Sequence, residues 1–170
     1  MVVDSILDHY YGTVPTEFVY KGKTYTPRTY SDQYLGLNPD DYLEITSYTH
    51  HPFYTRFVLE DKYNWTGDAY WNVTLDDFVS ITNHALDNGF TVGWDGDADD
   101  PDFHYNEGYA SLKNPPLGAQ QKARQQAFDS QTTLLDHMMH IVGRVRQNGM
   151  TWYYVKNSWG TMSNSAGGFL

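Results

Sequence analysis

The chain has 170 residues, a formal net charge of −10 and no cysteine, a size that fits one domain or one lobe of a larger domain. The acidic balance argues against nucleic acid and anionic membrane surfaces as partners, because both attract a footprint of Lys and Arg. The lack of cysteine excludes a disulfide scaffold and a thiolate metal site, and no apolar run approaches the roughly 18 residues of a membrane helix.

The first half of the chain predicts short elements separated by turns. Apolar residues at helical spacing predict a helix that Gly12 ends, and Lys21-Gly22 between two Tyr- and Thr-bearing runs is typical of a hairpin. The elements expected are a helix over residues 2–11, a hairpin over 17–26, a helical turn over 30–35, a strand over 42–48 and a connecting segment over 64–72.

The second half contains the clearest helix. Thr74 can cap it, acidic residues occupy its first turn, and Asn88-Gly89 closes it. The elements that follow are a strand over residues 90–94, an acidic loop over 95–101, a polar helix over 120–128 and two strands from Met138 onward. Strands mixed with a few helices predict an α+β fold.

Two stretches suggest a metal site, and in both the pattern is incomplete. The acidic run from Asp95 to Asp102 begins like a calcium loop, but Asp100 stands where the loop needs glycine and Asn106 where it needs glutamate. His50 and His51 are adjacent, so on a strand they would point to opposite faces, and no spaced carboxylate or histidine completes a set. We therefore expect no metal and no cofactor.

The residues that most clearly indicate a catalytic function are Asp136-His137-Met138, followed after a hairpin by Asn157-Ser158-Trp159-Gly160. A histidine oriented by an asparagine amide is half of a nucleophilic catalyst, and a Cys or Ser is the other half. The chain has no cysteine, and its serines near the motif lack a paired-base spacing. It therefore carries a base and its orienter without a nucleophile.

These residues, with Gly143 six positions after His137, resemble the C-terminal half of a papain-like (C1) cysteine peptidase. Residues 7–15, 49–54 and 124–129 resemble the bleomycin hydrolase / aminopeptidase C branch of that family. Together the similar segments run from about residue 5 to Gly160. Nothing in the chain matches the family's N-terminal lobe, which carries the nucleophilic cysteine.

The resemblance implies the antiparallel β-barrel-like lobe of the papain-like fold, with a few helices. Residues 1–170 would form this single lobe. Residues 1–70 would hold the connecting and first-strand region, and residues 71–170 the helix, the core strands and the His/Asn hairpin.

The resemblance also assigns roles and partners. His137 would be the catalytic base, Asn157 its orienter and Trp159 a supporting cover over the pair. We expect a fragment of a cysteine aminopeptidase that is inactive alone, with a peptide substrate, the missing Cys-bearing lobe as a partner, a homo-oligomer that is a hexamer in the family, and a cytoplasmic location. The alternative is a non-enzymatic peptide- or protein-binding domain derived from such a peptidase.

His140 competes with His137 for the contact with Asn157. A two-residue Asn148-Gly149 turn would pair His140 with Asn157. A three-residue or bulged loop beginning at Gln147 would instead bring Met139 opposite Asn157, with His137 diagonal to it on the same face. Local turn preference favours His140, whereas the resemblance favours His137; we predict the His137 contact and the longer loop.

Overall fold

The structure is a computed structural model that describes residues 2–112 and 118–170. The chain divides into two compact units, residues 1–43 and residues 44–170, which are described separately. The assignment of residues 1–170 to a single lobe stays a prediction. None of the described helices combines the length and apolar character that crossing a bilayer requires.

The first unit is built from short elements. They are α1 (Val2–Tyr11), β1 (Phe18–Tyr20), β2 (Lys23–Tyr25), α2 (Pro27–Tyr30), the π-helical turn η1 (Ser31–Leu35) and the 3₁₀ turn η2 (Pro39–Asp41). Lys21 and Gly22 both have positive φ, 49° and 76°, as a tight two-residue hairpin turn requires. The predicted first helix, hairpin and helical turn are confirmed.

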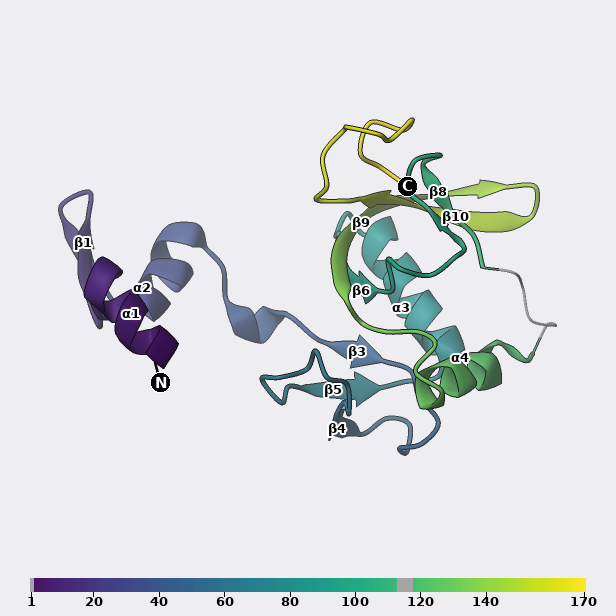
Figure 1. Ribbon diagram of the computed structural model, residues 1–170, viewed down its shortest axis with the longest axis horizontal. Helices are drawn as coiled ribbons and strands as arrows, with labels where there is room; N and C mark the ends of the chain where they lie inside the picture. Colours follow the sequence, from purple (N-terminus) through teal and green to yellow (C-terminus); the bar gives the residue numbers. More distant parts are fainter. Residues whose placement is uncertain (1, 113–117) are drawn as a thin grey trace. The chain divides into compact units, whose positions relative to one another are not determined.

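The second unit contains two three-stranded sheets and a small hairpin (Figure 1). Its strands are β3 (Ile45–Thr46), β4 (Arg56–Val58), β5 (Ala69–Asn72), β6 (Val92–Gly96), β7 (Phe103–His104), β8 (Tyr109–Ala110), β9 (His137–Gln147) and β10 (Met150–Lys156), and its helices are α3 (Leu75–Asp87) and α4 (Gln120–Asp129). The strand orders are β3-β5-β4, β10-β9-β6 and β7-β8, and among the described strands of this unit only the β3–β5 pair is parallel. This architecture confirms the α+β class.

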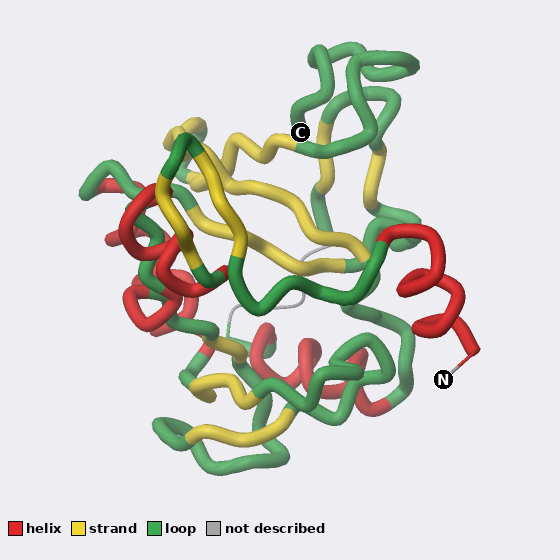
Figure 2. Tube along the Cα trace, turned by 90° about the vertical axis from the view of Figure 1, so that its left-hand side faces the viewer, coloured by secondary structure: helices red, strands yellow, loops and turns green. Residues whose placement is uncertain are grey.

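The sheets of the described residues stay small and open, and none of them closes into a barrel (Figure 2). The predicted strand over 42–48 shrinks to two residues, and the predicted connecting segment over 64–72 instead contains β5, the middle strand of its sheet. The aromatic pair Tyr70-Trp71 favours a strand, but the turn residues just before it favour a connecting segment, and the sequence-based prediction followed them.

The apolar core lies between α3 and the β10-β9-β6 sheet (Figure 1). Met139 and Ile141 of β9 are buried with Val155 of β10, and Leu86 of α3 packs against them. Alternate residues of a strand share one face, so His137 lies on the same face of β9 as Met139. The core therefore fixes which way His137 points.

A polar network attaches α4 to the rest of the second unit. The Gln121 Oε1 accepts hydrogen bonds from the Leu75 N–H at 2.7 Å and from the Ser47 hydroxyl at 3.1 Å. The Arg124 Nε donates to the Ser47 carbonyl oxygen at 2.9 Å, and Ser47 is fully buried. Through these contacts the polar helix α4 satisfies backbone groups of the buried Ser47 after β3 and of the partly buried Leu75 at the start of α3.

Candidate catalytic site

The turn between β9 and β10 has two residues. Gln147 pairs with Met150, and Asn148 and Gly149 both have positive φ, 53° and 80°, which is the geometry that an Asn-Gly turn favours. The predicted three-residue loop is therefore wrong. With an uninterrupted ladder from this turn, His140 would lie opposite Asn157.

A β-bulge farther along the hairpin changes that register. Tyr154 pairs with Gly143, but the next residue, Val155, pairs with Ile141, so Val142 has no partner on β10. A bulge of this kind inserts one residue into one strand and shifts every later pair by one. Lys156 then pairs with His140, and the following residue of the chain, Asn157, comes level with Met139. The register needed for a His137 contact is thus reached through a bulge within β9.

His137 and Asn157 are in direct contact. The His137 Nε2 lies 2.7 Å from the Asn157 Oδ1, and Asn157 is only 6% exposed. The same oxygen accepts a hydrogen bond from the Ser158 N–H at 2.6 Å, so two donors meet one atom and fix the orientation of the amide. The exposed His140 lies next to Lys156 on β10 and makes no such contact. The predicted choice of His137 for this contact is confirmed.

The contact determines which nitrogen of His137 carries the proton. An amide oxygen only accepts, so the His137 Nε2 is the N–H donor to Asn157. The Nδ1 of His137 makes no hydrogen bond within residues 2–112 and 118–170. It is the ring nitrogen that can take up or release a proton at this site. The catalytic role of this pair stays a prediction.

Trp159 packs against the imidazole. The two ring centroids lie 4.6 Å apart with an angle of 34° between the planes. Phe103 and Tyr105 meet the indole in edge-on contacts at 6.0 and 4.9 Å, and the Tyr105 hydroxyl donates to the Gly160 carbonyl oxygen at 2.6 Å. The indole is therefore held in place beside His137, although 47% of Trp159 is exposed and the cover over the pair is partial.

Two buried polar atoms near the site lack partners among the described residues, the Asn157 Nδ2 and the Asp95 Oδ1. Burial raises the pKa of Asp95, and the nearby charges of Asp136 and Asp61 raise it further. Asp95 belongs to β6 and pairs with Met138, so this carboxyl with a raised pKa lies next to the strand that carries His137.

The acidic stretch after β6 uses its carboxylates to hold its own backbone. Asp97 accepts hydrogen bonds from the N–H groups of Asp99 and Leu134, both at 2.9 Å. Asp100 accepts one from the Asp102 N–H at 2.8 Å. The loop also keeps Asp100 and Asn106 where a calcium loop needs glycine and glutamate.

We therefore expect no specific calcium binding by this loop. Calorimetric titration of the chain with CaCl₂ should show no stoichiometric site tighter than about 10⁻⁴ M, the weak end of natural calcium loops. A tighter site that Asp97→Asn and Asp100→Asn abolish would contradict this expectation.

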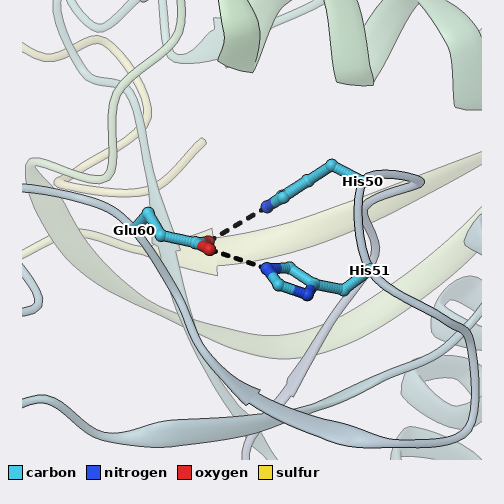
Figure 3. A group of neighbouring side chains, drawn as sticks. All are labelled: His50, His51 and Glu60. Carbon is cyan, nitrogen blue, oxygen red and sulfur yellow. Dashed lines mark hydrogen bonds and ion pairs between the residues drawn. The ribbon is translucent and has the colours of Figure 1, made fainter.

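His50 and His51 lie differently from the sequence-based expectation. They occupy a bend after β3 rather than a strand, so their side chains do not alternate, and both rings reach the carboxylate of Glu60 (Figure 3). The expectation that no carboxylate completes a set around these histidines is wrong. Sequence reasoning missed Glu60 because the bend that turns both histidines toward it depends on contacts with residues distant in the sequence.

Comparison with known proteins places the chain in a family. The model that describes the Peptidase C1-like family matches residues 11–170. The chain belongs to this family. It is also similar in fold to the crystal structure of PepW from Lactobacillus rhamnosis HN001, with a TM-score of 0.63 and 22% sequence identity over 98% of this chain. The match covers 42% of the PepW chain. No curated protein sequence matches.

Proposed function

We propose that this chain supplies the base and its orienter, His137 and Asn157, to a cysteine peptidase whose nucleophile lies outside these 170 residues. The carrying observation is the 2.7 Å contact between the His137 Nε2 and the Asn157 Oδ1, which leaves the Nδ1 available, in a chain that has no cysteine. Membership of the Peptidase C1-like family supports this reading.

In the proposed reaction the His137 Nδ1 takes the proton from the cysteine thiol, and the thiolate attacks the carbonyl carbon of the peptide bond. When the C–N bond breaks, the imidazolium returns that proton to the leaving amine. Water then hydrolyses the thioester, with the same nitrogen as base. Asn157 keeps the ring in one tautomer and orientation throughout, and Trp159 shields part of the imidazole from solvent.

The finer assignment is a peptidase of the bleomycin hydrolase / aminopeptidase C kind, which removes N-terminal residues from peptides. Residues 7–15, 49–54 and 124–129 support it by their resemblance to that branch. The proposal includes the partners of that branch: a Cys-bearing lobe and a homo-oligomeric assembly. An upstream reading frame that encodes a cysteine lobe would support this assignment, and a stop codon directly before Met1 would contradict it.

The chain alone should not hydrolyse peptides, because no thiolate is present to form an acyl-enzyme. Purified chain incubated with aminoacyl fluorogenic substrates should give no turnover above background. Turnover that persists in the presence of a thiol-directed inhibitor and disappears in Asn157→Ala would reveal another nucleophile and overturn the proposal.

A further inference from the structure

The bend that carries His50 and His51 is held by a buried asparagine. Asn72, at the end of β5, is fully buried. Its side-chain nitrogen donates to the carbonyl oxygens of Tyr48 at 2.8 Å and His51 at 2.9 Å, and its oxygen accepts from the Tyr48 N–H at 2.9 Å. Three bonds to one short segment fix the backbone from which both imidazoles project.

The two imidazoles converge on one carboxylate. The His50 Nε2 lies 3.0 Å from one Glu60 oxygen, and the His51 Nε2 lies 2.6 Å from the other. Figure 3 shows the two rings approaching Glu60 side by side, one toward each oxygen. The three ligand atoms all lie within 4.8 Å of one another. The ligand atoms of a tetrahedral zinc ion lie roughly 3.3 Å apart, given bond lengths near 2.0 Å. A small movement of the rings away from the carboxylate would therefore make room for an ion.

Packing and hydrogen bonding hold both rings. The His51 ring stacks on Phe57 with a centroid distance of 4.2 Å, and the His50 ring stacks on Phe128 at 5.2 Å. The Nδ1 of His50 faces the side-chain amide of Gln125, whose nitrogen and oxygen lie 3.0 and 3.4 Å away. For His50 to bind a metal through its Nε2, its Nδ1 must carry the proton, and the Gln125 oxygen is the atom that can accept this N–H. Such a bond sets the tautomer and ring orientation of a metal-bound histidine.

The surroundings favour a cation. Glu60 lines a cavity of about 210 Å³ together with Asp61 and Asp129, and Lys62 is the one cationic side chain in that lining. This cavity gives a path to the carboxylate and room for a water or another ligand beside it.

We propose that His50, His51 and Glu60 form a divalent-cation site that takes Zn²⁺ through the two Nε2 atoms and the carboxylate. Two imidazole nitrogens and one carboxylate are a donor set that zinc uses with a fourth position open to water. The site is distinct from the His137–Asn157 pair, and it does not depend on the proposed peptidase function.

The test is calorimetric titration of the chain, purified without a histidine tag, with ZnCl₂. The wild-type chain should bind one Zn²⁺ with a Kd of about 1 μM or lower, a free energy of about −8 kcal/mol. Glu60→Gln and His51→Gln should each weaken binding at least about tenfold, because even supporting contacts of metal ligands cost that much. His140→Gln is the matched control, since it removes an exposed histidine and should leave the affinity unchanged.

Circular dichroism shows whether each variant folds. If a variant does not fold, the visible spectrum of the Co²⁺-loaded wild-type chain still tests the proposal. That spectrum should indicate tetrahedral ligation by nitrogen and oxygen. The proposal is overturned by the absence of a stoichiometric Zn²⁺ site, by unchanged affinity in folded Glu60→Gln and His51→Gln, or by an equal loss in His140→Gln. Because the readout is metal binding, failure of this proposal and failure of the peptidase proposal are separate results.

Discussion

Replacing His137 with alanine should lower kcat by about 10²–10⁴-fold in the proposed longer peptidase, which would supply the nucleophile; this is the range expected for loss of a general acid and base. The physical reason is the geometry of the ring. Its Nε2 is committed to Asn157 at 2.7 Å, so only the Nδ1 can exchange a proton with the thiol and the leaving amine. Steady-state kinetics on aminoacyl substrates measures the effect.

The matched variant is His140→Ala, three residues away on the same strand. His140 is exposed and pairs with Lys156, so its loss should change kcat only slightly. Asn157→Ala should fall between the two, because the imidazole would remain but lose its fixed tautomer and orientation. Equal losses in His137→Ala and His140→Ala would point to a general effect on the fold and would contradict the assigned roles.

The choice between His137 and His140 shows what local sequence signals can predict. The Asn148-Gly149 pair does form the two-residue turn that its sequence favours. The turn alone would nevertheless select the wrong histidine, because the bulge at Val142 shifts the ladder between the turn and the site. A glycine inside a strand is a signal of a bulge, and Gly143 stands directly after Val142.

The strongly patterned helices were predictable for a different reason. The Thr74 hydroxyl accepts a hydrogen bond from the Asp77 N–H at 3.2 Å, and α3 runs to Asp87 with Asn88 as its C-cap, so local capping chemistry defines both ends. No comparable local sequence signal predicts the bend around His50. It depends on Asn72, which is 24 residues from Tyr48 in sequence but bonded to it through both side-chain atoms.

That dependence predicts a large loss of stability on replacing Asn72 with alanine. Asn72 has no exposed surface, and its amide satisfies the N–H and carbonyl groups of Tyr48 and the carbonyl of His51. Alanine leaves these buried groups without their partner, and each unsatisfied group costs about 1–3 kcal/mol. We therefore expect the free energy of unfolding to fall by about 3–4 kcal/mol, a large effect for one residue, measured by urea denaturation.

Asn88→Ala provides the comparison. Its side chain also donates to a backbone carbonyl, that of His84 at 2.8 Å, but Asn88 is exposed at the end of α3. Water can replace this bond, so the loss should stay below about 1 kcal/mol. Equal stability of the two variants would show that the bend does not depend on Asn72. If Asn72→Ala still folds, release of the bend should separate His50 and His51 from Glu60 and weaken zinc binding while leaving the His137–Asn157 contact intact, because that contact is set by the β9–β10 register.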